Sequence, residues 1–121
     1  MITLINWFEI PVHDLERAVT FYQEALGVTL RRETVAGIEM AIFPHTKPAT
    51  GGALVKGELF TPSQAGAVVY LATPDLATTL ECVAALGGAC SVGPVVLPHD
   101  IGTIALIIDC EGNRVGLHQP A

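Results

Sequence analysis

Four side chains with acid-base or ligand-binding chemistry lie in segments that are otherwise rich in apolar residues. They are Glu9, Tyr70, Arg114 and His118. A carboxylate such as Glu9 can act as a general base, and an imidazole such as His118 can carry a proton or stabilise an oxyanion. The phenol of Tyr70 can hydrogen-bond a ligand oxygen, and the guanidinium of Arg114 can bind a carboxylate or phosphate through two hydrogen bonds. Glu9, His118 and Tyr70 are therefore candidate catalytic residues, and Arg114 is a candidate ligand-binding residue.

Each candidate also has a purely structural interpretation. Glu9 could be hydrogen-bonded in the wall of the fold, Tyr70 could be a packed aromatic residue, and His118 could end its strand at a rim. Arg114 follows a Gly-Asn turn, where an arginine is more often solvated or ion-paired. The other histidines are expected to be exposed, although the loops around two of them could cover a site: His13 precedes a helix, and His45 and His99 lie in proline-bounded loops.

An internal duplication supplies the elements that must position these side chains. Residues 7–12 align with residues 68–73, and both segments have the apolar or alternating pattern of short strands. Asp14 then falls on Asp75, and each is followed by apolar residues at helical spacing: Leu15, Val19, Tyr22 and Leu26, then Leu76, Leu80, Val83 and Leu86. The aspartates are predicted N-caps, and Gly27 and Gly88 are predicted left-handed C-caps.

Each predicted helix is followed by three extended segments. They span residues 29–33, 37–43 and 52–56 in the first half, and 89–93, 103–108 and 114–118 in the second. The predicted fold class is α+β, with two βαβββ modules that pair into a cup-shaped mixed sheet. We expect a single domain over residues 1–121, with module one at 3–57, module two at 66–119 and the junction at 57–66.

The inner wall of such a cup is the natural site for a small molecule, because each sheet has one face that its own helix does not cover. Alternation along the first strand places Trp7 and Glu9 on this inner face. Phe8, Ile10 and Val12 then belong to the face covered by the helix. Tyr70 is the repeat partner of Glu9 and is expected to face the same cavity.

Composition narrows the class of partner. The chain has 12 acidic and 6 basic residues among its 121, and a formal net charge of −6, so nucleic acid is not expected as a partner. No apolar run approaches the roughly 20 residues of a membrane-spanning helix, and the amino terminus has no export signal, so we expect a cytoplasmic protein that binds no membrane. The three cysteines, Cys82, Cys90 and Cys110, are not spaced for disulfides or a metal site.

Two segments carry a resemblance to a known family. Residues 6–12 (Asn-Trp-Phe-Glu-Ile-Pro-Val), followed by Asp14-Leu15, Ala18, Phe21-Tyr22 and Leu26-Gly27, resemble the opening of vicinal oxygen chelate proteins. Residues 109–118 resemble the family's Asp-Pro-Asp-Gly-Asn turn and last strand, with Cys110 and Glu111 in place of Pro and Asp. The resemblance spans nearly the whole chain and implies the glyoxalase/bleomycin resistance fold and a homodimer.

In metal-dependent members of the family, two His and two Glu from the first and last strands of each module hold a divalent ion. In this sequence those positions fall on Trp7, near Val68, near Ala53 and on Gly116, none of which offers a metal ligand. We therefore predict no cofactor and interpret Trp7, Val68 and Gly116 as ligand-binding positions. A displaced metal site that uses Glu9 and His118 is an alternative with only two protein ligands.

Two functions from different classes follow from the resemblance. The preferred hypothesis is a metal-independent protein that binds a small organic ligand in the cup between its modules, as bleomycin resistance proteins do. The alternative is a glyoxalase-like lyase or isomerase with Glu9 as the general base and His118 or Tyr70 holding an enolate oxygen, with or without a metal. The sequence leaves open whether one chain or a dimer forms the cup.

Overall fold

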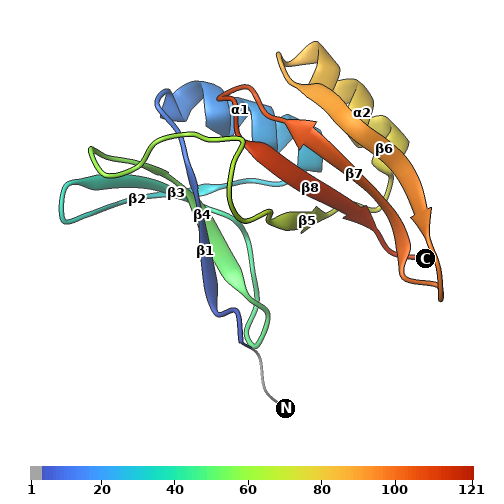
Figure 1. Ribbon diagram of the computed structural model, residues 1–121. Coiled ribbons are helices and arrows are strands. Elements are labelled where there is room, and N and C mark those ends of the chain that lie inside the picture. Colours follow the sequence, from blue (N-terminus) through green and yellow to red (C-terminus); the bar gives the residue numbers. More distant parts are fainter. Residues whose placement is uncertain (1–3) are drawn as a thin grey trace.

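The computed structural model describes residues 4–121 and shows two four-stranded sheets and two helices (Figure 1). The first module contains β1 (Trp7–Pro11), α1 (Leu15–Leu26), β2 (Arg31–Val35), β3 (Ile38–Ile42) and β4 (Gly51–Lys56). The second contains β5 (Tyr70–Ala72), α2 (Leu76–Ala85), β6 (Ala89–Leu97), β7 (Gly102–Ile108) and β8 (Arg114–Gln119). The predicted βαβββ order and α+β class are confirmed. The predicted start of module one, Thr3, lies outside the described residues.

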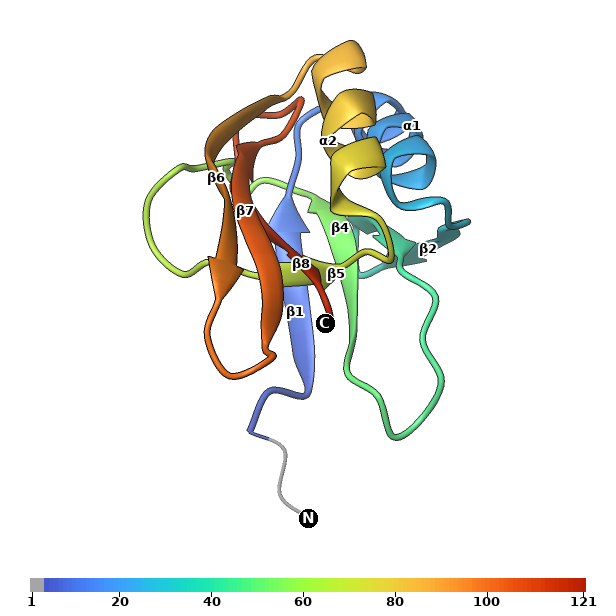
Figure 2. The ribbon, with the colours of Figure 1, turned by 90° about the vertical axis from the view of Figure 1, so that its right-hand side faces the viewer.

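The two sheets have the same topology. In the first, β1 is parallel to β4, and β3 lies between β4 and β2, giving the order β1-β4-β3-β2; the second has the order β5-β8-β7-β6. The register places Glu9 opposite Ala53 in the first sheet and Tyr70 opposite Gly116 in the second. The two helices lie side by side at one end of the molecule, and the two sheets extend away from them (Figures 1 and 2).

Both helices begin at the predicted aspartates. The Asp14 carboxylate accepts a hydrogen bond from the Arg17 N–H at 3.1 Å, and the Asp75 carboxylate accepts one from the Thr78 N–H at 3.2 Å. These bonds satisfy N–H groups that have no partner within the helix. Gly27 ends α1 in the left-handed conformation, with φ 67°, as predicted.

The predicted end of the second helix is wrong by one residue. Leu86 is the C-cap of α2, and Gly87, with φ 95°, takes the left-handed conformation that we predicted for Gly88. Gly88 is constrained differently, because a Cβ at this position would lie 2.8 Å from the carbonyl oxygen of Ile108. The first glycine of the pair therefore ends the helix, and the second allows the chain to pass close to β7.

Three strands differ clearly from the predicted extents, and the first of them, β2, is shifted by two residues from the predicted 29–33 to Arg31–Val35. The predicted strand at 68–73 is shortened to β5, so Val68 precedes the regular ladder, although the Val69 carbonyl still accepts a bond from the Gly116 N–H at 2.9 Å. β6 continues past the Gly93-Pro94 pair, where we expected it to end. It is an edge strand with register irregularities between Cys90 and Val95, and such bulges tolerate glycine and proline.

One hydrophobic cluster contains residues of both modules. It includes the inner faces of the helices and the strand residues beneath them: Ile10, Val12, Phe21, Tyr22 and Leu54 from the first module, and Leu71, Leu76, Val83, Ile107 and Leu117 from the second. Ile10 and Val12 lie on the helix-covered face of β1, as the alternation predicted, and Phe8 packs against the same cluster. Trp7 and Glu9, which alternate with them, are exposed.

Candidate functional site

The Trp7 indole projects from the first strand beside a histidine ring. Trp7 is paired with Gly51 on β4, and the rings of Trp7 and His45 make an edge-to-face contact with centroids 6.0 Å apart. A Cβ at Gly51 would lie 2.5 Å from the His45 ring, so this glycine allows the imidazole to pack there. The Trp7 Nε1–H donates a hydrogen bond to the Glu9 carboxylate at 3.3 Å. The loop around His45 therefore contributes to the surroundings of Trp7.

In the second module, a glycine likewise leaves room for an aromatic ring, that of Tyr70. Tyr70 is paired with Gly116 on β8, and a Cβ at Gly116 would lie 2.4 Å from the ring. The ring therefore lies against the bare backbone of β8. About half of Tyr70 is exposed, at 48%. A glycine beside an aromatic residue thus recurs in both modules, and Gly116 acts here by leaving room for a neighbour.

Trp7 and Tyr70 both line one large hollow between the modules, which we call the Trp7–Tyr70 hollow. Its cavity volume is about 590 Å³, and its lining includes Ile5, Trp7, Phe8, Phe43, Val68 and Tyr70. Apart from the indole N–H, the phenol and Thr50, the lining side chains are apolar. A cavity of this size, with a few polar groups, suits a small organic molecule. The structure brings together the predicted ligand-binding positions Trp7 and Val68.

The candidate His118 belongs to a second hollow, the His118 hollow, on the face of the second sheet that α2 does not cover. This hollow has a volume of about 490 Å³ and is lined by Tyr70, Ala72, Leu97, Ile101, Ile104 and His118. The His118 Nε2 lies 2.6 Å from the backbone carbonyl oxygen of Ile101, so this nitrogen carries the proton and donates to that oxygen. Tyr70 lines both hollows and lies between them.

The remaining candidates, Glu9 and Arg114, line a smaller cavity at the junction of the modules, the Arg114 pocket. It has a volume of about 120 Å³, and its lining includes Glu9, Pro11, Ser63, Ala67, Asn113 and Arg114. Glu9 therefore does not share a hollow with His118 or Tyr70. The structure separates the three candidate catalytic residues into two groups, with the carboxylate apart from the imidazole and the phenol.

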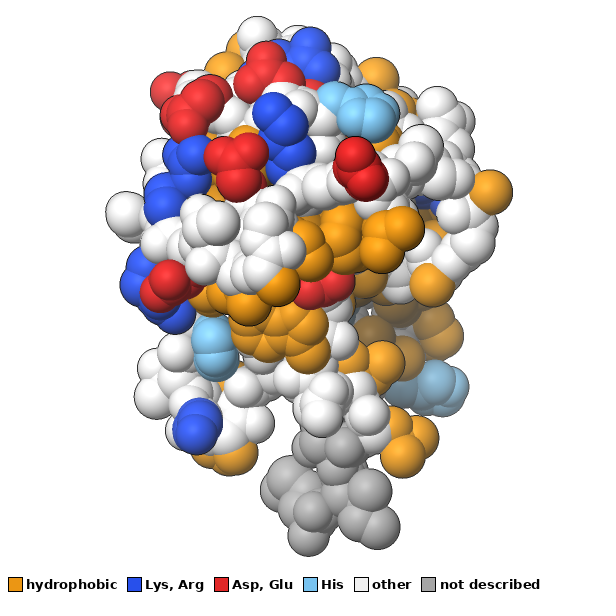
Figure 3. All heavy atoms as spheres, turned by 90° about the vertical axis from the view of Figure 1, so that its left-hand side faces the viewer, with side chains coloured by type: hydrophobic (Ala, Val, Ile, Leu, Met, Phe, Trp, Pro, Cys, Tyr) orange, Lys and Arg blue, Asp and Glu red, His pale blue; other side chains and the backbone are white. Residues whose placement is uncertain are grey.

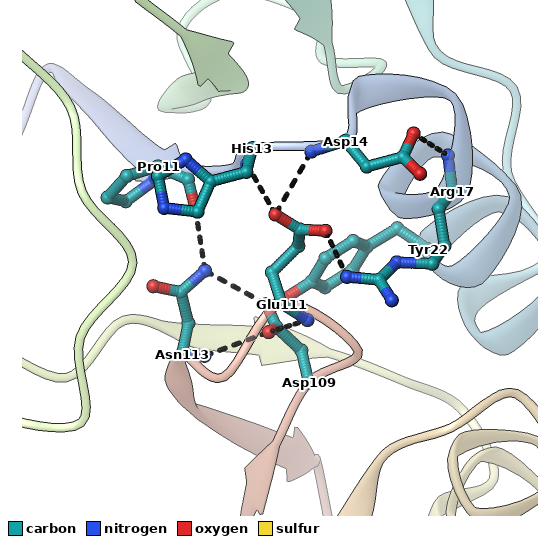
Figure 4. Close-up of polar contacts among 8 residues, drawn as sticks. All are labelled: Pro11, His13, Asp14, Arg17, Tyr22, Asp109, Glu111 and Asn113. Atoms are coloured by element: carbon teal, nitrogen blue, oxygen red, sulfur yellow. Dashed lines mark hydrogen bonds and ion pairs between the residues drawn. The ribbon is translucent and has the colours of Figure 1, made fainter. Parts of the chain in front are cut away.

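A buried polar network joins the two modules, and sequence reasoning did not identify it (Figure 4). The Tyr22 hydroxyl of α1 donates to the Asp109 carboxylate, and the Asn113 amide donates to the Pro11 carbonyl at 2.7 Å. The Asp109 carboxylate also accepts the Asn113 backbone N–H at 2.9 Å. Burial, with the neighbouring charge and hydrogen bond of Asp109, raises the pKa of Tyr22 well above its ordinary value, so the hydroxyl remains a donor.

Glu111 extends this network to the start of α1. Its carboxylate, only 1% exposed, accepts a hydrogen bond from Arg17 at 2.6 Å and others from the backbone N–H groups of His13 and Asp14. Burial opposes ionisation, but the bonds from Arg17, His13 and Asp14 outweigh it and lower the pKa of Glu111. Burial and the nearby Asp109 raise the pKa of Cys110 to about 11, so its thiol is protonated at neutral pH.

Comparison with known proteins places this geometry in a family. A family model described as bleomycin resistance protein-like N-terminal matches residues 5–43. TnmS3, an antibiotic binding protein from Streptomyces sp. CB03234, is 27% identical with a TM-score of 0.71, and the alignment covers 99% of this chain and 98% of that chain. A glyoxalase/bleomycin resistance protein from the same organism is 27% identical with a TM-score of 0.70, covering 95% and 99%. The family model and these neighbours are those of glyoxalase/bleomycin resistance proteins, consistent with the predicted vicinal oxygen chelate superfamily.

A longer protein also matches this chain. A mutant of glyoxalase I from Zea mays is 28% identical to it with a TM-score of 0.71, covering 94% of this chain and 45% of that one. The chain therefore spans less than half the length of the maize protein. No curated protein gave a match. None of the described helices has the length and apolar character needed to cross a lipid bilayer.

The metal-ligand positions of the superfamily do not fit a divalent ion in this chain. By the register of the sequence they fall on an indole and a glycine, Trp7 and Gly116, and near two aliphatic side chains, Val68 and Ala53. Within residues 4–121, no three His, Cys, Asp or Glu side chains are grouped so that they could hold an ion. Glu9 and His118, the displaced pair considered above, line different cavities.

Proposed function

We propose that this protein binds a small, largely apolar organic molecule in the Trp7–Tyr70 hollow without the help of a metal ion. The observation that carries the proposal is a cavity of about 590 Å³ lined mostly by apolar and aromatic side chains. Burial of a ligand against them would contribute roughly 25 cal/mol per Å² of apolar surface, less the entropy of association. The indole N–H and the phenol would orient polar atoms of the ligand.

Two further observations support this function. TnmS3, which matches over nearly its entire length, is described as an antibiotic binding protein. The hollow also lacks a charged lining residue, and the chain carries a net charge of −6, so a neutral or cationic organic molecule suits it better than a polyanion. Figure 3 shows apolar side chains gathered across the middle of one face, with charged side chains mostly in its upper part.

The structure favours binding over the lyase or isomerase alternative. Such a reaction needs a base and an oxyanion donor on the same substrate, a few ångströms apart. The Glu9 carboxylate lines the Arg114 pocket, whereas the Tyr70 phenol and the His118 imidazole line other hollows. No single ligand position in one of these cavities contacts all three groups.

We also propose that the protein acts as a homodimer. The His118 hollow opens on an apolar face of the second sheet, with Tyr70, Val95 and Ile101 between 42% and 50% exposed. Exposed apolar area of this kind is typical of an interface. Analytical ultracentrifugation should show a species of twice the chain mass, and a monomer at all concentrations would refute this part of the proposal.

Fluorescence provides a direct test of the hollow, because Trp7 is the single tryptophan of the chain. Bleomycin and a panel of neutral aromatic metabolites should include compounds that change its emission saturably. Tyr70→Ala should weaken their binding at least tenfold, whereas Tyr70→Phe, which keeps the ring, should weaken it less. Added EDTA should leave binding unchanged. A requirement for metal, or no saturable change with any compound, would contradict the proposal.

A further inference from the structure

Arg114 is the only one of the four arginines without an ion pair within residues 4–121. Arg17 pairs with Glu111, Arg31 with Glu33 and Arg32 with Glu16. The Arg114 Nε is moreover buried, and no hydrogen-bond acceptor among the described residues contacts it. A guanidinium is charged at all relevant pH values, and a buried donor without an acceptor is destabilising. Among the described residues, no carboxylate pairs with the Arg114 guanidinium, so its terminal N–H groups are available to an anion.

The other polar groups of the Arg114 pocket are already engaged. The Asn113 side-chain oxygen accepts the Ser63 N–H at 3.0 Å, and its amide donates to Pro11. The Ser63 hydroxyl accepts the Ala65 N–H at 2.9 Å. One Glu9 carboxylate oxygen accepts the Trp7 indole N–H. Among the described lining residues, the guanidinium of Arg114 thus has the largest unused hydrogen-bonding capacity, and it faces a cavity.

We propose that the Arg114 pocket binds the carboxylate group of a small organic acid, with Arg114 as the anion-binding residue. The terminal N–H groups of a guanidinium point in parallel and match the two oxygens of a carboxylate. A cavity of about 120 Å³ corresponds to roughly four water molecules at about 30 Å³ each, enough for a carboxylate with a few carbon atoms.

Glu9 opposes anion binding in this pocket. Its carboxylate lines the same cavity without an ion pair to Arg114. Glu9 repels a bound anion and Arg114 attracts it, and both Coulomb energies scale with the charge of the ligand. Removing the Glu9 charge should therefore strengthen anion binding.

This pocket is distinct from the site of the proposed function. Ala67 and Val69 line both cavities, but Glu9 and Arg114 belong only to the small one, and Trp7 and Tyr70 only to the large one. Trp7 fluorescence reports on the large hollow, and the NMR signal of the Arg114 Nε–H reports on the small pocket. Failure of one proposal can therefore be recognised independently of the other.

Titration with propionate, followed through the four arginine Nε–H signals, tests the proposal. The Arg114 signal should shift saturably in the millimolar range, while those of Arg17, Arg31 and Arg32 stay in place. Equal shifts of all four signals or no saturable shift would overturn the proposal.

Substitutions test which side chains are responsible for propionate binding. Arg114→Gln should weaken propionate binding at least tenfold by calorimetry, and Arg114→Lys, which keeps the charge but loses the parallel donors, should also weaken it. Arg31→Gln, on the exposed strand β2, is the matched control and should bind like the parent protein. Glu9→Gln, which removes the repelling charge, should bind propionate more tightly than the parent protein. Propionate binding that appears only in Glu9→Gln would instead show that Glu9 occupies Arg114 in solution and would refute the proposal.

Discussion

At the scale of single residues, two glycines leave room for rings at the Trp7–Tyr70 hollow: Gly51 for the His45 ring beside Trp7, and Gly116 for Tyr70 itself. A side chain at Gly51 would collide with the His45 ring that contacts Trp7, and one at Gly116 would collide with Tyr70. The aromatic surface therefore depends on residues that contribute no side chain of their own. Gly116 occupies a metal-ligand position of the superfamily, and in this chain its function is to leave room for the tyrosine ring.

The substitution Gly116→Ala tests this dependence. The added methyl group would lie 2.4 Å from the Tyr70 ring, which must move away from β8, so we expect a loss of about 1–3 kcal/mol in the free energy of unfolding. Binding in the Trp7–Tyr70 hollow should weaken as well. Urea denaturation and Trp7 fluorescence measure the two effects.

A double variant is the control for Gly116→Ala. Combining it with Tyr70→Ala removes the collision, so most of the lost stability should return while ligand binding stays weak. If the double variant is as unstable as the sum of the two single variants, the methyl group acts on the backbone of β8 and not on the tyrosine ring.

The Tyr22 hydroxyl carries a second prediction at this scale. Tyr22→Phe keeps the packed ring but removes the donor to the buried Asp109 carboxylate, which should cost about 1–3 kcal/mol of stability. Tyr70→Phe is the matched control. Because Tyr70 is half-exposed, removing its hydroxyl should lower the free energy of unfolding by no more than about 0.5 kcal/mol. Equal thermal midpoints for the two variants would show that the bond to Asp109 contributes nothing.

At the scale of elements, the duplication and local chemistry predict most of the fold. Aspartate caps and the apolar spacing located both helices, and alternation placed Trp7 and Glu9 on the face away from α1. The errors occur where tertiary contacts decide between two equal local signals. The Gly87-Gly88 pair offers two candidate C-caps, and only the approach of the Ile108 carbonyl distinguishes them. The bulged continuation of β6 depends similarly on its pairing with β7.

The end of α2 provides a prediction at this scale. Gly87→Ala places a Cβ on a left-handed residue with φ 95° and should cost about 1–2 kcal/mol. Gly87→Asn should cost less, because asparagine adopts this conformation more readily than alanine. Urea denaturation of the two variants measures the difference. If Gly87→Ala were neutral, the left-handed residue would not contribute to ending the helix.

At the scale of the whole molecule, the angle between the two sheets decides which candidate residues meet. The sequence identified Glu9, Tyr70, Arg114 and His118 singly, but their division among three cavities depends on how the modules pack. The network of Tyr22, Asp109 and Glu111 has the same origin, since its partners lie far apart in the chain. One signal was present in the sequence: the two segments that resemble the family are the two that this network joins (Figure 4).

Because Glu111 joins the second module to the start of α1, it should make the stability of the whole molecule depend on pH. Its folded pKa lies below its ordinary value of 4.5. The unfolded chain therefore takes up the proton first as the pH falls, and the contribution of Glu111, complete above about pH 5, declines as the pH falls through 4.5 toward the folded pKa.

Glu111→Gln keeps an acceptor for the His13 and Asp14 N–H groups but loses the charge that pairs with Arg17. It should be less stable than the parent at neutral pH and approach the parent as the pH falls through 4.5 toward the folded pKa. Glu24→Gln, on the exposed side of α1, is the matched control and should follow the parent curve. Parallel stability curves for Glu111→Gln and the parent would show that this carboxylate is not what links the modules.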